Sequence, residues 1–294
     1  MTNTQTAPPA RTATIPADPA YFTHSGADTF FPTKAAGGYW GEDLLSGPAV
    51  AGLAAWALER DFAEAGFLPA RFSIDLLKPA RKEALRTRTR VVRSGRRARY
   101  TECEIVQGDA IVARATVVFY QQSHAPQGQQ WSPATEFTGP PSARGDELIV
   151  GSDSAGWGAL GAAHQNTSRK RAYYGGLDVV AGSTATPFVR CVVVAEAATN
   201  MVVNLGTRGI GYINGDLTVT LFRLPRSQAL GVQGDTHFAA DGISIGSATL
   251  FDDDGPVGTA SVTALANPDA QIDFAEAPRN DAPGVELFTA AGNR

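Results

Sequence analysis

Apolar and polar residues alternate along two long parts of the chain, and this period of two is typical of strands with one buried face. In the first part the pattern predicts strands ending at Pro79 and over 83–93, 96–106 and 110–120. In the second it predicts strands over 215–224, 229–239, 243–252 and 257–266. Gly-containing turns separate several of these runs, as in antiparallel hairpins. A shorter strand pair, FFPTK and GYWG, is expected between 28 and 40.

Two other apolar stretches have helical spacing. The first begins after Ser46, an N-cap candidate, and runs through GPAVAGLAAWALERDFAEAG to a stop at Gly66. The second is expected from about 190 to 205, before Gly206. The first helix is rich in Ala and Gly, so we expect a sheet to approach it closely.

The two parts repeat the same order of elements. Pro79 corresponds to Pro225 and Gly108 to Gly255, with a shift of about 146 residues, and a period this long indicates a duplicated domain. The order predicts an α+β protein with two antiparallel sheets, each wrapped around a central helix. We divide the chain into a disordered leader (1–24), a first unit (25–122), a linker (123–145), a second unit (146–268) and a tail (269–294). A site is expected near the seam between the units.

Composition narrows the class of protein. The apolar fraction of 43% and charged fraction of 18% suit a globular protein, and the net charge of -4 disfavours a nucleic-acid binder. The first twenty residues have no apolar signal region, and no apolar run approaches the length of a membrane span. Cys103 and Cys191 lie in apolar runs, so we expect buried free thiols and a cytoplasmic protein. Neither metal-ligand spacing nor a serine-hydrolase or nucleotide-binding motif is present.

Several stretches, in the same order, resemble one family. The first half reads SGPAVAGLAAWALE and then ARFSIDLLKPARKEALRTRTRVVRSGRR. The second reads VVAGSTATPFVRCVVVAEAATN, then NGDLTVTLFRLP and LFDDDGPVGTAS. Over about residues 30–266 the chain is similar to the acyl-CoA thioesterase II group and its actinobacterial thioesterase-like relatives. The resemblance implies a tandem (double) hotdog fold and hydrolysis of acyl-CoA to a free acid and CoA.

The resemblance also implies a site in the second unit. Relatives orient a water with an Asp on the helix, a Thr or Asn-like residue on the next strand and a Gln on the last strand. The Asp position matches Glu196, the strand position matches Asn214, and the Gln position falls on Val262 or Thr263. Many relatives carry a His at the start of the first helix, where this chain has Ser46. The carboxylate is therefore kept, whereas the Gln and the His are not.

The residue types alone leave two roles open for each of these positions. Glu196 in an apolar helix suits a general base, or it is an exposed residue of a helix. Asn214, before Gly215, is a site residue or part of a turn. Thr263 is catalytic or structural. Ser46 and Gly47 form an ordinary helix start, or their backbone N–H groups receive an oxyanion.

The first unit also contains the densest positive charge of the chain. Alternation places Arg86, Arg88 and Arg90 on one face of the sheet, and Arg93 follows them. These residues form a dock for the CoA phosphates, with Arg93 as the substrate-binding residue, or they are a solvated face.

The leading hypothesis is a thioester hydrolase with Glu196, Asn214 and Thr263 as catalytic residues and Ser46, Gly47 and Arg93 as substrate-binding residues. No metal and no cofactor are expected apart from CoA as part of the substrate. The expected partner is acyl-CoA or an acyl-carrier thioester, without nucleic acid or membrane, and homo-oligomers are plausible. The alternative is a non-catalytic acyl-thioester binding protein. A third hypothesis, a hydratase or dehydratase on the same fold, lacks the His near the central helix that such chemistry uses.

Overall fold

A computed structural model describes residues 20–26, 28–133, 135–141 and 147–275 of the chain. Its main feature is a 15-stranded sheet in the order β10-β1-β2-β4-β5-β6-β3-β14-β17-β16-β15-β9-β7-β8, with β13 also paired to β17. The first-half strands are β1 (Ala20–Ser25), β2 (Thr29–Pro32), β3 (Phe67–Leu76), β4 (Leu85–Ser94), β5 (Ala98–Gln107) and β6 (Ala110–Gln121). The second-half strands are β7 (Ile149–Ser152), β8 (Gly156–Ala159), β9 (Lys170–Tyr174), β10 (Asp178–Val180), β13 (Tyr212–Asn214), β14 (Asp216–Leu221), β15 (Leu230–Ala240), β16 (Ile243–Asp252) and β17 (Gly255–Ala266).

The two halves do not form separate sheets but share one continuous sheet. β3 and β14 pair in antiparallel register, with Ser73 opposite Thr218. The Thr218 hydroxyl donates to Ser73 Oγ at 3.1 Å, so the join is also made by side chains. The sheet is not wholly antiparallel either, because β10 from the second half runs parallel to β1 at the far edge of the first half. The second half therefore supplies one strand, β10, to the edge of the first half.

Eight of the predicted strands are confirmed as β3–β6 and β14–β17. The prediction for GYWG is wrong: after β2 the chain forms a short 3-10 helix, η1 (Lys34–Ala36), and then turns. β2 pairs instead with β1, which begins inside the predicted leader, so the leader boundary at residue 24 is too late. Residues 1–19 lie outside the described residues. The alternation analysis missed β7–β10, which are only three to five residues long.

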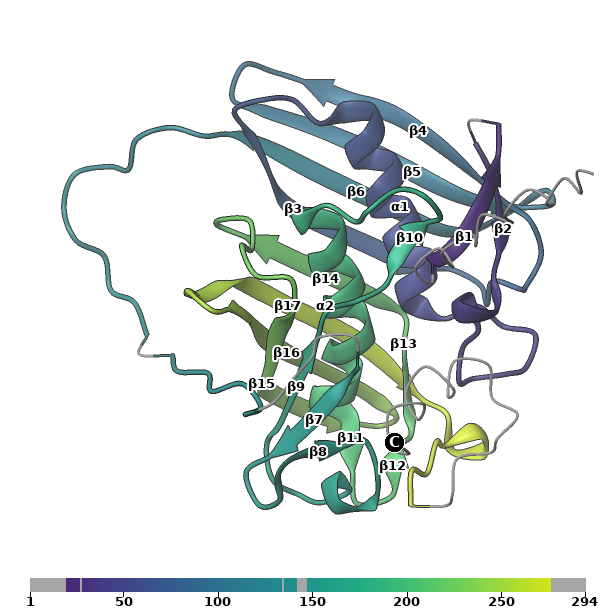
Figure 1. The fold of residues 1–294 in the computed structure, drawn as a ribbon, viewed down its shortest axis with the longest axis vertical. Coiled ribbons are helices and arrows are strands. Elements are labelled where there is room, and N and C mark those ends of the chain that lie inside the picture. The colour runs from purple at the N-terminus through teal and green to yellow at the C-terminus, as the bar shows by residue number, and fades with distance from the viewer. Residues whose placement is uncertain (1–19, 27, 134, 142–146, 276–294) are drawn as a thin grey trace, which may run out of the picture.

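Several short elements complete the fold. Beyond the main sheet are a small ladder of β11 (Leu205–Gly206) and β12 (Gly209–Ile210), and the 3-10 helices η2 (Ala162–His164) and η3 (Pro268–Ala270). The last of these lies in the predicted tail, of which residues 276–294 are outside the described part. The segment between β6 and β7 extends away from the body in Figure 1, and its described residues form no helix or strand.

Two helices fill the inside of the sheet (Figure 1). Helix α1 (Gly47–Phe62) packs on β4, β5 and β6, and α2 (Pro187–Asn204) packs on β9, β15, β16 and β17. The helices also contact each other, and Gly52 makes this possible: a Cβ there would lie 2.8 Å from Val193 Cγ2 of α2. The same Cβ would lie 2.9 Å from Val179 Cγ2 of β10, so Gly52 admits both the second helix and a strand of the sheet, the latter as expected.

The start of α2 shows why the prediction began it too late. Thr186 is the N-cap, and its hydroxyl accepts from the N–H of Val189 at 3.2 Å. Pro187 occupies the first turn, where its missing N–H costs nothing. From Phe188 to Asn204 nearly every residue is buried, so α2 is a core helix with little exposed face. Cys191 on α2 and Cys103 on β5 are buried free thiols, as predicted. Within the described residues no helix is long and apolar enough to cross a membrane.

The hairpin end between β16 and β17 is held by an ion pair. Arg223 forms two contacts with Asp252 at 2.6 Å, and the side chain of Asp252 is fully buried. Asp252 also accepts from the backbone N–H groups of Arg226 and Asp254. The neighbouring pair Arg226–Asp254 is largely exposed.

We expect Asp252→Ala to lower the free energy of unfolding by about 3–5 kcal/mol, because it leaves the Arg223 guanidinium and two N–H groups without their partner. Asp254→Ala breaks an exposed pair in the same hairpin and should cost less than about 1 kcal/mol. Urea unfolding at neutral pH measures both values. Equal, small losses in the two variants would show that the Asp252 pair does not hold the hairpin.

Candidate functional site

Glu196 lies in the middle of α2, in contact with the start of α1. Its side chain is almost fully buried, so the alternative of an exposed helix residue is excluded. The carboxylate lies directly against Gly47, the first residue of α1: a Cβ on Gly47 would be 1.7 Å from Glu196 Oε1 and 2.5 Å from Oε2. Only a residue without a side chain allows this approach. The site therefore joins the two halves of the chain.

The start of α1 gives this contact its electrostatic character. The first N–H groups of a helix lack intrahelical partners and carry partial positive charge. Ser46 occupies the N-cap position, but its side chain makes no capping hydrogen bond. Its hydroxyl is buried and has no hydrogen-bond partner among the described residues. The helix start thus brings polar donors to the place where the Glu196 carboxylate lies.

Asn214 forms the third part of the site. Its Nδ2 donates to Glu196 Oε1 at 3.1 Å. The Asn-Gly pair is the end of β13 rather than a free turn, because Gly215 donates to Thr263 O and accepts from Leu76 N. Burial raises the pKa of Glu196 to about 7, and the Asn214 hydrogen bond opposes this rise by favouring the charged form. A carboxyl group with this pKa is suited to take up a proton at neutral pH.

Two buried tyrosines belong to the same region and were missed in the sequence. Tyr21 on β1 and Tyr174 on β9 are hydrogen-bonded through their side chains. Burial raises the pKa of Tyr21 well above its usual value, and the negative charge of nearby Glu196 adds to the rise. Tyr21 therefore stays neutral at physiological pH. The apolar residues Ala20, Tyr21 and Phe22 were the available signal, but the segment was assigned to the leader.

The structure does not bring Thr263 to Glu196, so this part of the prediction is corrected. On β17, Val262 and Ala264 are buried, whereas Thr263 is exposed because neighbouring residues of a strand point to opposite faces. Its backbone contributes instead, donating to Asp216 Oδ1 at 2.9 Å. The β17 residue opposite Asn214 is Ala264, which has no polar side chain. Of the two positions matched to Gln in the relatives, Val262 has an apolar side chain and Thr263 lies on the exposed face.

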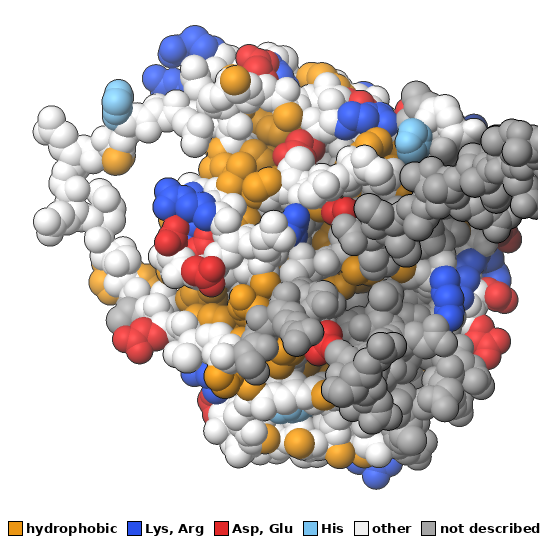
Figure 2. Space-filling view, viewed as in Figure 1, with side chains coloured by type: hydrophobic (Ala, Val, Ile, Leu, Met, Phe, Trp, Pro, Cys, Tyr) orange, Lys and Arg blue, Asp and Glu red, His pale blue; other side chains and the backbone are white. Residues whose placement is uncertain are grey.

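Arg93 is also remote from Glu196. Arg93 is an exposed residue near the end of β4, a strand whose Thr89 contacts Asp61 at the C-terminal end of α1. Gly47 lies at the opposite end of this 16-residue helix, about 21 Å from Asp61 along the axis. Arg90 on the same strand pairs with Glu102 of β5. The basic side chains of β4 therefore lie beside acidic ones of β5, as on a solvated sheet face, and acidic and basic side chains are likewise intermixed on the face shown in Figure 2.

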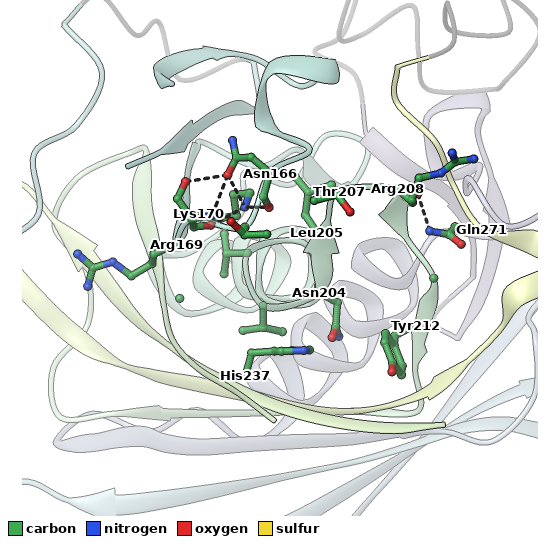
Figure 3. A pocket seen from close by; sticks show the side chains of 18 of the residues that line it. Asn166, Arg169, Lys170, Asn204, Leu205, Thr207, Arg208, Tyr212, His237 and Gln271 are labelled. Carbon is green, nitrogen blue, oxygen red and sulfur yellow. Dashed lines mark hydrogen bonds between the residues drawn. The ribbon is translucent and has the colours of Figure 1, made fainter. Parts of the chain in front are cut away.

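A cavity of about 720 Å³ opens at the C-terminal end of α2 (Figure 3). Its lining includes the polar or charged residues Asn204, Tyr212, His237, Lys170, Arg208 and Gln271. Asn204 is eight residues beyond Glu196, or about 12 Å along the helix axis. The cavity and the buried carboxylate are thus separate features. Glu196 is the stronger candidate for a base, because its buried carboxyl group has a pKa raised to about 7 and lies against a helix start.

Comparisons with known proteins agree on one group. Residues 37–120 match the family model of the acyl-CoA thioesterase N-terminal domain. Residues 122–266 match that of the acyl-CoA thioesterase C-terminal domain. No curated protein sequence matches the chain significantly.

Solved structures give the same fold. The tesB protein of Mycobacterium avium subspecies paratuberculosis is 16% identical, with a TM-score of 0.59 over 84% of this chain and 96% of that one. The acyl-CoA thioesterase II TesB2 of Mycobacterium marinum is 13% identical, with a TM-score of 0.59 over 84% and 94%. A protein with a hot dog fold from Alicyclobacillus acidocaldarius is 15% identical, with a TM-score of 0.60 over 84% and 96%. At these identities the structures show a hotdog fold.

Proposed function

Since this chain belongs to the acyl-CoA thioesterase family and is a thioester hydrolase, we propose that Glu196 activates the water that attacks the thioester carbonyl. The observation that carries the proposal is the contact of a buried carboxylate with Gly47 of the other half and with Asn214. A base must be charged, desolvated and held in place, and these two contacts meet the last two conditions.

The proposed reaction has two steps. Water gives a proton to Glu196 as its oxygen bonds to the carbonyl carbon, and the carbonyl oxygen becomes an oxyanion. The N–H groups at the start of α1 and the unpartnered Ser46 hydroxyl stabilise this oxyanion. The carbon–sulfur bond then breaks, and the thiolate of CoA takes the proton from Glu196. The products are the free acid and CoA, and the route uses neither a covalent enzyme intermediate nor a metal.

The finer fold assignment is part of the proposal. We assign a double hotdog, in which α1 with its strands is one unit and α2 with its strands is the other. The β3–β14 pairing and the α1–α2 contact support two units joined edge to edge. The substrate is a thioester of CoA or of an acyl carrier. Homo-oligomers and a cytoplasmic location stay predictions from the sequence.

The test is thiol release from a panel of acyl-CoA substrates from short to long chains, followed across pH 5–9. We expect turnover, with kcat/KM falling as pH decreases through about 7, because protonation of Glu196 removes the base. Turnover with no change between pH 6 and 8 would contradict the role of Glu196. Saturable binding without turnover on every chain length would instead support the acyl-thioester binding protein.

A further inference from the structure

Glu196 begins a polar stripe on a helix that is otherwise apolar. Asn200 and Asn204 follow at intervals of four residues, which places all three on one face of α2. Asn200 and Asn204 are both buried. Buried amides are costly unless they are hydrogen-bonded, and apolar residues would fill this core position at no such cost. The stripe therefore calls for a reason other than packing.

The amides form one continuous hydrogen-bond chain. The hydroxyl of Ser244 on β16 donates to Asn204 Oδ1 at 2.8 Å. Asn204 Nδ2 donates to Asn200 Oδ1 at 2.7 Å, and Asn200 Nδ2 donates to the backbone oxygen of Tyr212 at 3.0 Å. Every link points in the same direction, an arrangement in which each bond strengthens the next. The chain ends on β13, the strand that carries Asn214.

β13 needs such support because it is short. It has three residues and pairs with β17 along one edge. Helix α2 holds it at two points, through Asn200 at Tyr212 and through Glu196 at Asn214. The contact at Tyr212 is to its backbone oxygen, two residues before Asn214 in the same three-residue strand. Fixing the backbone at Tyr212 therefore fixes the direction from which the Asn214 amide reaches Glu196.

The sheet beneath the stripe has a matching pattern. Ser244, Ala264 and Asn214 are direct neighbours across β16, β17 and β13. Ser244 and Asn214 are the outer members of this row and contact Asn204 and Glu196 respectively. The small Ala264 lies between them under the stripe. The helix stripe is thus tied to the strand row at both ends, by Asn204 to Ser244 and by Glu196 to Asn214.

We propose that Asn200, Asn204 and Ser244 are positioning residues that hold β13 so that Asn214 binds the Glu196 carboxylate in its reactive orientation. Their importance for turnover rests on the proposed function. Their effect on the Asn214–Glu196 contact does not, so the two ideas can fail separately. Titratable groups near this region include Tyr21, Tyr39 and Tyr174, whose pKa values burial raises, and Tyr212, against whose ring His237 packs.

The experiment compares wild type with Asn200→Ala, Asn214→Ala and the double variant. The pKa of Glu196 is measured by carbon-13 NMR of labelled glutamate, with the signal assigned by Glu196→Gln, and kcat and KM are measured on acyl-CoA. We expect Asn200→Ala to raise the pKa of Glu196 and to lower kcat about tenfold at nearly constant KM, because a small displacement of a catalytic group slows the chemical step. Asn214→Ala should raise the pKa further, and the double variant should match Asn214→Ala alone.

Two further variants guard the interpretation. Ser244→Ala removes only the outermost link and should give a smaller rise in the same pKa, even if Asn200→Ala folds poorly. Thr199→Val changes the neighbouring buried residue of α2, whose hydroxyl has no partner in the described part of the chain, and should leave the pKa of Glu196 and kcat unchanged. Additive effects of Asn200→Ala and Asn214→Ala would overturn the proposal. So would a pKa of Glu196 that stays the same in Asn200→Ala, Asn214→Ala and Ser244→Ala. If Asn200→Ala and Ser244→Ala change the pKa of Glu196 but Glu196→Gln keeps full activity, the positioning role stands. The catalytic role of Glu196 is then wrong.

Discussion

Glu196→Gln is expected to lower kcat/KM at pH 8 by at least about 10²-fold, because an amide of nearly the same shape cannot accept the proton of the attacking water. The substitution keeps the volume of the buried side chain, so packing against Gly47 is retained. Glu196→Asp should keep part of the activity, since a carboxylate remains but its reach is shorter by one methylene group. Thiol release from the best acyl-CoA of the panel measures all three proteins.

The loss of activity in Glu196→Gln should not come from unfolding of the variant. The folded-state pKa of Glu196 is about 7 against an ordinary value of 4.5, so folding favours the protonated form. The stability associated with the protonated group is present below about pH 4.5 and is lost as pH rises through about 7. A neutral Gln avoids this loss, so Glu196→Gln should be at least as stable as wild type at pH 8 in thermal unfolding. Thr263→Val, on the exposed face of β17, serves as the control and should keep full turnover. Full turnover by Glu196→Gln itself would place the reaction elsewhere.

Gly47→Ala is expected to abolish turnover to a similar degree. The added Cβ would lie 1.7 Å from Glu196 Oε1, a distance that no contact tolerates, so the carboxylate or the start of α1 must move. Either movement separates Glu196 from the helix start, and errors near 1 Å can cost about 10²-fold in rate. Since the clash is buried, we also expect the free energy of unfolding to fall by about 1–3 kcal/mol.

A matched glycine separates this clash from a general effect of alanine. The nearest atom to a Cβ on Gly161 would be 4.0 Å away, so Gly161→Ala should change neither rate nor stability appreciably. Combining Gly47→Ala with Glu196→Ala removes the clashing carboxylate and should restore stability but not turnover. Unchanged kcat in Gly47→Ala would mean that the Gly47–Glu196 contact is not part of the reactive arrangement.

The strands of the two meanders could be predicted because their pattern is local. Alternation over ten or more residues defines β4 to β6 and β15 to β17, whichever partners they find. The pairing between distant segments could not be predicted in this way. β10 and β1 are three and six residues long, and their parallel contact depends on the approach of the two halves. The same holds for β13, whose last residue, Asn214, is followed by Gly215 in an Asn-Gly pair that favours a turn.

The candidate site was predicted in part for a related reason. Glu196 stands out as a single carboxylate in an apolar helix, and Asn214 was found by resemblance. Their contact with Gly47 depends on how the helices cross, a relation between distant segments that no periodicity records. Thr263 was misplaced because a shift of one residue along a strand reverses the face on which a side chain lies. Tyr21 was missed because its strand has no regular alternation.

The β3–β14 pairing makes the peptide connection between the halves dispensable once the protein has assembled. A cut in the exposed segment after β6 would leave the shared sheet, the contact between α1 and α2 and the β1–β10 pairing in place. The two fragments should therefore complement each other when they are produced together. Produced alone, the first fragment would expose β3 and the second β14 as an unpaired edge strand, so both would be prone to aggregate. The second fragment would also contain Glu196 without the start of α1 that makes it reactive.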